Sequence, residues 1–329
     1  MRKKRKGRII FGLKAFLLGG LSCLIILLFT SPAFPQKKRI SIGGAQAGGT
    51  HYPLAVGFSE IINRFLPEYN AIALETGGTL ENIRLLGKGE IEIANGDMQA
   101  AARGYKGEKP FITPVKNIRL GFYLNTVILH VVTLEKTKIK TMEDLKGKVV
   151  SVGAPGSMVA ANTEILLRLH NISMKDLKIR HLAPGEAMEA LADGLIDVAV
   201  LYSALPSSAV NSLAVKHKVR LVTGDEKVLK GAETRENILC FYVLPETYKG
   251  QSEGAFAWSV VGATYFNEAT SPEDVYNWTK VIMEHKDVLQ KVHPLGKEVR
   301  LVNKKELEIS PIALHPGILK YAKEVGVSY

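Results

Sequence analysis

Ile40-Ser41-Ile42-Gly43-Gly44-Ala45-Gln46-Ala47-Gly48-Gly49-Thr50-His51-Tyr52-Pro53 is the stretch around which this sequence is organised. Ile40 and Ile42 alternate with Ser41, as in a short β-strand, and apolar residues recur at helical spacing after Pro53. The glycines between them predict a loop that places the start of a helix beyond the end of the strand. Free backbone N–H groups and the helix dipole make such a start suitable for binding an anion.

The same pattern recurs in the second half of the chain. Val150-Ser151-Val152-Gly153 leads through Ala154-Pro155-Gly156-Ser157 into a helical run that ends near His170. Each half also contains a helix, a glycine and a short strand in that order, at 85–94 and 190–199. The duplication predicts two α/β lobes built alike, with mostly parallel sheets and a ligand beyond the carboxyl ends of the strands.

Two apolar runs are expected to carry the chain between the lobes. They are Ile118 to Leu134 and Asn237 to Leu244, the second stopped by Pro245. We therefore predict a first lobe of residues 38–122 and 243–329, a second lobe of residues 123–242, and a hinge at the crossings. The polar segment from Lys216 to Glu236 is expected to be an irregular surface loop.

The N-terminus has the composition of an export signal. Basic residues precede an apolar run from Ala15 to Phe29, and Ser31-Pro32-Ala33 supplies the small residues that a signal peptidase recognises. We predict a signal peptide over residues 1–33 and a folded part in the periplasm. The alternative is an uncleaved membrane anchor, because residues 15–34 could just span a bilayer.

The net charge of +11 does not indicate nucleic-acid binding. Seven of the positive charges lie in the first fourteen residues, which contain no acid, and removing them leaves +4 for the remainder. That balance is ordinary for a soluble domain, so no nucleic-acid partner is expected. Cys240 is the only cysteine outside the predicted signal, so an exported chain can form no intramolecular disulfide.

Three helix starts carry hydroxyl groups that could meet one ligand. They are Thr50, Ser157 and Thr79, and Thr79 is expected to be the N-cap of a helix through Leu86. Hydroxyl and N–H groups that converge from several helix starts suit a small ligand with a carboxylate. The alternative for Thr79 and Ser157 is helix capping without any contact to a ligand.

Two further polar residues follow predicted strands and are expected at the same cleft. Asp97 comes after the strand near 91–94, and Tyr202 comes after the strand at 196–201. A carboxylate at Asp97 could accept a ligand ammonium or orient hydroxyl groups. The alternatives are a turn aspartate for Asp97 and ordinary packing at the rim for Tyr202.

The sequence lacks the common motifs of enzymes and metal sites. Thr50 stands where a phosphate-binding loop has its lysine, and neither G-x-G-x-x-G nor G-x-S-x-G occurs. The eight histidines include no H-x-H or H-E-x-x-H pair. We therefore expect no catalytic residue, no cofactor and no metal.

Six blocks of the sequence together resemble a known family. They are 47–54, 76–86, Asp97, 153–157, 190–197 and 315–326, with Ala47-Gly48-Gly49-Thr50-His51-Tyr52-Pro53-Leu54 as the first and His315-Pro316-Gly317 opening the last. The blocks occur in the family's order and cover nearly the whole exported chain. In them the sequence resembles the TAXI-type solute receptors of tripartite ATP-independent periplasmic (TRAP) transporters.

The resemblance implies a periplasmic-binding-protein-like (type II) α/β fold with two lobes, a hinge and a ligand cleft between the lobes. It implies a receptor that captures a small organic anion, such as an amino acid, a dicarboxylate or a 2-oxo acid. The receptor would deliver this anion to TRAP membrane permease subunits without ATP. Carried over position by position, the expected ligand contacts are Gly49, Thr50, His51, Tyr52, Gly78, Thr79, Asn82, Asp97, Ser157 and Tyr202.

Three positions depart from the family's pattern. His51-Tyr52 stands where the family usually has two tyrosines, Met158-Val159 where a glycine and a threonine often follow the serine, and Ala204-Leu205-Pro206 where a glycine commonly precedes the proline by two residues. We therefore expect a bulkier and more apolar second-lobe wall, which would set ligand selectivity. An alternative function is a membrane-tethered ligand sensor of the same fold. An enzyme is a third hypothesis, kept only because fold does not fix function.

Overall fold

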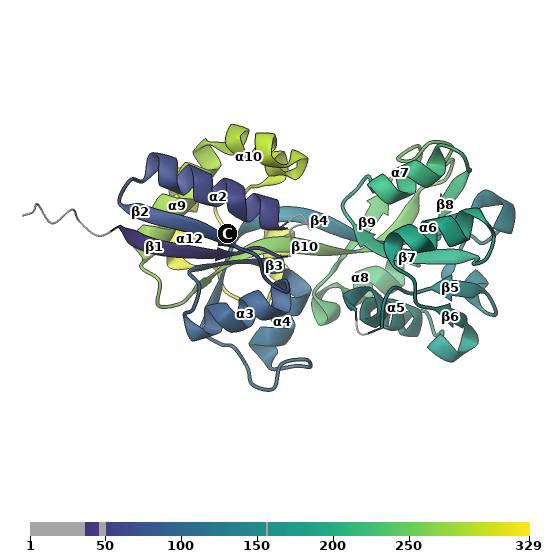
Figure 1. Ribbon diagram of the computed structural model, residues 1–329. Coiled ribbons are helices and arrows are strands. Elements are labelled where there is room, and N and C mark those ends of the chain that lie inside the picture. The colour runs from purple at the N-terminus through teal and green to yellow at the C-terminus, as the bar shows by residue number, and fades with distance from the viewer. Residues whose placement is uncertain (1–36, 46–50, 156) are drawn as a thin grey trace, which may run out of the picture. The chain divides into compact units, whose positions relative to one another are not determined.

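The computed structural model describes residues 37–45, 51–155 and 157–329 (Figure 1). From Arg39 onward, the sheet and helices described here belong to one compact unit, Arg39–Tyr329. The expected signal peptide or anchor at residues 1–33 lies outside the described residues. Within the described ranges, no helix combines the length and the apolar character that crossing a membrane requires.

Ten strands of the described ranges form one sheet. Its order is β2-β1-β3-β10-β4-β7-β5-β6, with β8 paired to β4 and β9 paired to β10. The strands are β1 (Lys38–Gly43), β2 (Tyr69–Leu74), β3 (Ile93–Asp97), β4 (Ile118–Leu134), β5 (Val149–Ser151), β6 (Lys178–Arg180), β7 (Val198–Ser203), β8 (Val219–Leu221), β9 (Leu239–Val243) and β10 (Ala255–Asn267).

Helices connect the strands and cover the sheet, as Figure 1 shows. The α-helices are α2 (His51–Phe65), α3 (Thr79–Lys88), α4 (Met98–Lys106), α5 (Met158–Leu169), α6 (Pro184–Ala192), α7 (Ser208–Ala214), α8 (Glu226–Glu236), α9 (Pro272–Glu284), α10 (Lys286–Val292), α11 (Lys304–Glu308) and α12 (Pro316–Glu324). Short 3-10 turns are η1 (Glu135–Thr137), η2 (Met142–Leu145), η3 (Met174–Asp176) and η4 (Pro294–Glu298).

Two long strands run side by side at the centre of the sheet. The predicted run from Ile118 to Leu134 is confirmed as β4, a single 17-residue strand that pairs antiparallel with both β10 and β7. The sequence interpretation did not identify β10, which pairs with β3, β4 and β9. The run at 237–244 was expected to return the chain to the first lobe. It forms the short strand β9, which pairs with β10.

The hydrophobic core is divided along β4 and β10. One cluster of buried residues comes from Ile40 to Leu124 and from Val261 to Ile318. Two further clusters come from Ile128 to Val260 and contain residues of β5 and β7. The change of cluster falls between Leu124 and Ile128 on β4 and between Val260 and Val261 on β10. We call the first cluster and the elements that carry it the first lobe. The two further clusters and their elements are the second lobe.

The expected surface loop from Lys216 to Glu236 is wrong. This segment contains strand β8 and the 11-residue helix α8, and the Asp225 side chain caps α8 by accepting a hydrogen bond from the Val228 backbone N–H at 3.0 Å. Only Leu229 and Ala232 of α8 are buried. The helix is polar because most of its surface faces solvent, and its apolar stripe is too narrow to stand out in the sequence.

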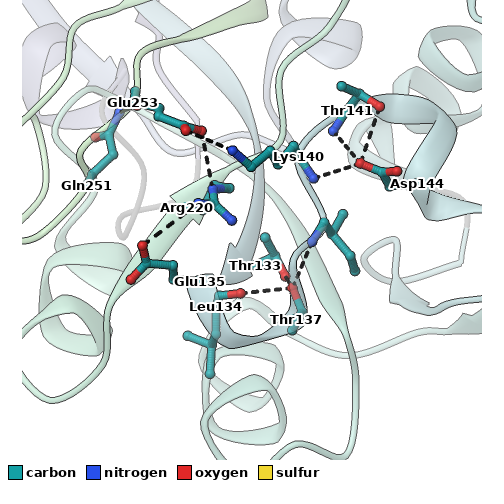
Figure 2. A network of polar contacts seen from close by, with 11 residues as sticks. Thr133, Leu134, Glu135, Thr137, Lys140, Thr141, Asp144, Arg220, Gln251 and Glu253 are labelled. Carbon is teal, nitrogen blue, oxygen red and sulfur yellow. Dashed lines mark hydrogen bonds and ion pairs between the residues drawn. The ribbon is translucent and has the colours of Figure 1, made fainter.

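A network of polar contacts secures second-lobe segments that lie far apart in the sequence (Figure 2). The Lys140 ammonium group lies 2.9 Å from a carboxylate oxygen of Glu253, and Arg220 lies within 4 Å of both Glu253 and Glu135. Asp144 accepts hydrogen bonds from the backbone N–H groups of Lys140 and Thr141, each at 2.9 Å. These contacts join the turn after β4 to β8 and to the segment before β10. The Lys140–Glu253 pair is exposed, and such a pair contributes little free energy.

Candidate functional site

The strand register brings the ends of β3 and β7 to one short stretch of β4. Asp97, the last residue of β3, pairs with Gly262 of β10, and Gly262 pairs in turn with Asn125 of β4. Four residues further along β4, Leu129 pairs with Tyr202 near the end of β7. The two residues that the sequence places after strands, Asp97 and Tyr202, therefore meet at the boundary between the lobes.

A cavity of about 210 Å³ lies at this boundary. Its lining combines first-lobe and second-lobe residues: His51, Asp97, Gln99, Val127, Met158, Asn162, Tyr202 and Val260. Small-molecule sites commonly enclose about 300–1,000 Å³, so this cavity fits a small solute better than a drug-sized ligand. Three of the residues expected to contact a ligand, His51, Asp97 and Tyr202, are among those that line it.

Asp97 holds the start of α4 and at the same time faces the cavity. One carboxylate oxygen accepts a hydrogen bond from the Ala100 backbone N–H at 2.7 Å, which makes Asp97 the N-cap of α4. The other carboxylate oxygen accepts a hydrogen bond from the Thr79 hydroxyl at 3.0 Å. Asp97 was expected either at the cleft or as a turn aspartate. It lines the cavity, and it ends a strand and caps a helix, a capping role that the sequence interpretation did not foresee.

The expected N-cap role of Thr79 is wrong. Gly78 occupies the N-cap position of α3 with a φ of 95°, and no side chain caps this helix. The Thr79 hydroxyl instead donates to Asp97 and accepts a hydrogen bond from the Asp97 backbone N–H at 3.1 Å. The hydroxyl is drawn away from its own helix because the β3 end lies close to it. A Cβ atom on Gly96 would come within 2.5 Å of the Thr79 side chain.

His51, the first residue of α2, packs against the two central strands. Its Nε2 lies 3.3 Å from the Asn125 Oδ1, and a Cβ atom on Gly262 would come within 3.0 Å of the same nitrogen. Burial lowers the pKa of His51, while the Asp97 carboxylate and the Asn125 hydrogen bond act in the opposite direction. The ring is therefore neutral at neutral pH, and glycine at position 262 leaves room for it.

Gln99 and Asn162 are polar cavity residues that the sequence interpretation missed. The Asn162 amide nitrogen donates to the Gln99 Oε1 at 2.6 Å and to the Tyr202 hydroxyl at 2.5 Å. The Gln99 amide nitrogen donates to the Glu236 carbonyl at the end of α8, at 3.3 Å. Gln99 belongs to the first lobe and Asn162 to the second, and no local motif marks either residue, since their relation arises from tertiary contact alone.

Tyr202 is partly buried and keeps its proton. Burial raises the pKa of its hydroxyl well above the ordinary value, and the hydrogen bond from Asn162 and the Trp258 indole act in the opposite direction. Tyr202 therefore does more than pack at the rim, because its hydroxyl takes part in the hydrogen bonds through Asn162 to Gln99 that join the two lobes.

The remaining expected contacts lie around the cavity or away from it. Ser157 has the capping role that was left open as its alternative, because its side chain accepts a hydrogen bond from the Ala160 backbone N–H at 3.2 Å at the start of α5. Tyr52 lies in the first turn of α2, against Gly44. Gly49 and Thr50 lie outside the described residues.

Asn82 has a supporting position in the first lobe. It is completely buried, and its amide nitrogen donates to the Gly44 carbonyl at 2.6 Å and to the Asn95 carbonyl at 2.8 Å. A Cβ atom on Gly43 would come within 2.5 Å of the Asn82 Oδ1. The side chain therefore fastens the end of β1 to β3.

The charge of the cavity wall is simple. Among the described lining residues, Asp97 carries the only carboxylate, and none is lysine or arginine. The described part of the chain contains no group of three or more His, Cys, Asp or Glu side chains that could hold a metal ion. These residues suit hydrogen bonding to a small molecule.

A larger hollow of about 410 Å³ lies between α6 and α7 of the second lobe. Its lining includes Met188, Leu213 and Lys216, all from one lobe. It lacks the ends of parallel strands and the buried polar groups that meet at the boundary between the lobes. We therefore take the smaller cavity as the candidate site.

The fold is similar to those of a solved solute-binding protein and of a protein solved with ATP bound. A TctC solute-binding protein from Polaromonas matches with a TM-score of 0.53 and 13% identity, over 85% of this chain and 94% of that chain. A Xanthomonas citri protein solved with ATP bound matches with a TM-score of 0.50 and 10% identity, over 88% of this chain and 100% of that chain. The predicted two-lobed α/β fold is confirmed. A family model described as NMT1-like matches residues 42–326, most of the chain, and the protein therefore belongs to the NMT1-like family.

Proposed function

We propose that this protein is the extracytoplasmic solute-binding receptor of a membrane transporter, of the TAXI type in a TRAP system. It captures a small organic anion, such as an amino acid, a dicarboxylate or a 2-oxo acid, by closure of its two lobes. It then delivers the anion to membrane permease subunits. The observation that carries the proposal is the cavity between the lobes, where Asp97 and Gln99 face Asn162 and Tyr202.

The likeness of fold to the TctC solute-binding protein supports a binding function in place of catalysis. The six sequence blocks that resemble TAXI receptors support the finer assignment. The basic and apolar N-terminus supports export to the periplasm. N-terminal sequencing of the exported protein tests this last point, because a start near Phe34 indicates a free receptor and a start at Met1 indicates a tethered sensor.

The proposed ligand lies with its anionic group toward the helix starts and away from Asp97. Ser157 at the start of α5 and the segment from Gly49 to Tyr52 before and within α2 are the proposed anion-binding positions. His51, Asp97 and Tyr202 contact the rest of the ligand, with Gly78 and Thr79 beside Asp97 and Asn82 in a supporting role.

The lobe limits are part of the proposal. The sequence places the second lobe at residues 123–242, but core residues from Val243 to Val260 pack with the second lobe. We therefore propose that the return limit lies near Val260, with the rest of residues 243–329 in the first lobe. Closure would then bend β4 and β10 where the core clusters change.

A thermal-shift screen of dicarboxylates, amino acids and 2-oxo acids tests the proposed function. A bound ligand raises the melting temperature, and above Kd the stabilisation grows with the logarithm of the ligand concentration. Ser157→Ala should weaken binding about 5–30-fold, the loss expected for about 1–2 kcal/mol of hydrogen bonding. Thr163→Ala is the matched control, because this hydroxyl on the same helix donates to the Val159 carbonyl and does not line the cavity. Stabilisation by none of these compounds would overturn the proposal.

A further inference from the structure

The orientation of the Asn162 amide is fixed by a chain of hydrogen bonds that begins at a backbone carbonyl. The Glu236 carbonyl can only accept, so the group of Gln99 that lies 3.3 Å from it is the donating amide nitrogen. The Gln99 Oε1 must then accept, so the Asn162 atom 2.6 Å away is the amide nitrogen. The order of donors and acceptors therefore follows from the chemistry of the first group in the chain.

The same chain fixes what Tyr202 can do. The Asn162 amide nitrogen also lies 2.5 Å from the Tyr202 hydroxyl, which must accept this hydrogen bond because the nitrogen has no lone pair to offer. The tyrosine's own hydroxyl hydrogen then has to point elsewhere. No residue in the described part of the chain accepts it.

The Asn162 Oδ1 is left without a partner at the other end of the same amide. Asn162 is 1% exposed, lines the cavity, and its Oδ1 forms no hydrogen bond with any described residue. An unpaired buried carbonyl of this kind costs about 1–3 kcal/mol unless a ligand or water satisfies it. The second-lobe wall thus offers an acceptor, Asn162 Oδ1, close to a donor, the Tyr202 hydroxyl.

We propose that Asn162 and Tyr202 are specificity-determining residues that select a ligand bearing a hydroxyl group. This inference rests on the proposed solute-binding function and narrows it to hydroxy acids. A hydroxyl donates one hydrogen bond to Asn162 and accepts one from Tyr202. An ammonium group cannot accept, a keto group cannot donate, and an unsubstituted carbon does neither.

Gln99 is a positioning residue in this scheme. It reaches from α4 of the first lobe to Asn162 of the second, so the order of donor and acceptor is imposed only when the lobes are in contact. The neighbouring lining residues Val127, Met158 and Val260 are apolar and offer no other polar partner to the hydroxyl. Specificity for the hydroxyl is thereby tied to lobe contact.

Two series of acids that differ only at carbon 2 test the proposal. The five-carbon series is glutarate, 2-oxoglutarate, 2-hydroxyglutarate and L-glutamate, and the four-carbon series is succinate, oxaloacetate, malate and L-aspartate. Dissociation constants are measured by calorimetry for the wild type and for Asn162→Leu, Tyr202→Phe and Gln99→Leu. In at least one series the hydroxy acid should bind at least about tenfold more tightly than its keto, amino and unsubstituted counterparts.

The ratio of the affinity for the hydroxy acid to the affinities for its counterparts separates a loss of specificity from a general loss of binding. Asn162→Leu and Tyr202→Phe should each reduce the hydroxy preference to about twofold or less, and Gln99→Leu should reduce it in part. Thr163→Val, a buried neighbour on α5 that does not line the cavity, should leave the ratio unchanged. Tyr202→Phe keeps the aromatic ring and removes only the hydroxyl. Its preference for the hydroxy acid therefore tests the proposal if Asn162→Leu does not fold.

The possible outcomes separate this inference from the proposed function. Binding without a preference for the hydroxy acid, or a preference that persists in both Asn162→Leu and Tyr202→Phe, overturns the inference and leaves the receptor function standing. Binding of no acid in either series contradicts the proposed function, and the inference fails with it. A hydroxy preference that both variants abolish supports the two together.

Discussion

The substitution Gly262→Ala probes the close packing beneath the cavity. Gly262 lies on β10 between Asp97 and Asn125, where a Cβ atom would stand 2.3 Å from the Asn125 Oδ1 and 3.0 Å from the His51 Nε2. Real Cβ atoms essentially never approach another heavy atom closer than 3.0 Å. Asn125 is completely buried, so it has little room to move aside.

The expected cost follows from this overlap. Inserting a methyl group into a packed site typically costs about 1–3 kcal/mol. For a domain of this size that corresponds to a fall of about 2–8 °C in the melting temperature. The displaced His51 side chain lines the cavity, so affinity for any ligand found in the thermal-shift screen should fall as well.

Thermal unfolding and calorimetry of Gly262→Ala measure both effects, with Gly231→Ala as the matched control. Gly231 is exposed on α8, and a Cβ atom there would have no neighbour within 4 Å, so alanine should stabilise the helix by about 0.5–1 kcal/mol. If Gly262→Ala has the melting temperature and the ligand affinity of the wild type, the packing around Gly262 is not as close as described.

Three further predictions concern other parts of the molecule. Asn82→Leu leaves the Gly44 and Asn95 carbonyls without their donor and should lower the free energy of unfolding by about 2–4 kcal/mol in urea denaturation; a loss below about 0.5 kcal/mol would contradict the supporting role. Burial lowers the pKa of the His130 imidazole to about 4 in the folded protein, whereas the imidazole of the unfolded chain takes up its proton near pH 6.5. The free energy of unfolding should therefore fall by about 2–3 kcal/mol between pH 7 and pH 4.5, and His130→Gln should remove that part of the loss. Lys140→Met should lower the free energy of unfolding slightly at low salt, and the loss should vanish in 1 M salt because the contact with Glu253 is exposed. A large loss that salt does not change would show that the network in Figure 2 is more than a surface contact.

The parts of the fold that local patterns define could be predicted from the sequence. The long apolar run from Ile118 to Leu134 indicated β4, and the repeated strand, loop and helix units indicated two α/β lobes. β10 escaped the prediction although all 13 of its positions, from Ala255 to Asn267, have partners in the sheet. A strand covered on both faces lacks the alternation of apolar and polar residues by which strands are recognised.

Errors at the site arose where tertiary contacts overrule local preference. Thr79 has the side chain of an N-cap, but its hydroxyl bonds to Asp97 because β3 ends next to it. Asn162 and Gln99 are 63 positions apart and belong to different lobes, so no spacing rule could join them. Asp97 and Tyr202 could be placed because a residue at the carboxyl end of a strand reaches a ligand cleft by topology alone.

A crystal structure with a bound compound tests whether a small solute binds in the cavity between the lobes. The compound is the one that stabilises the protein most in the thermal-shift screen. We predict ligand density within hydrogen-bond distance of Tyr202 and Asn162, with the anionic group at the starts of α2 and α5. Ligand density in the hollow between α6 and α7, with the cavity at Asp97 free of ligand, would contradict it.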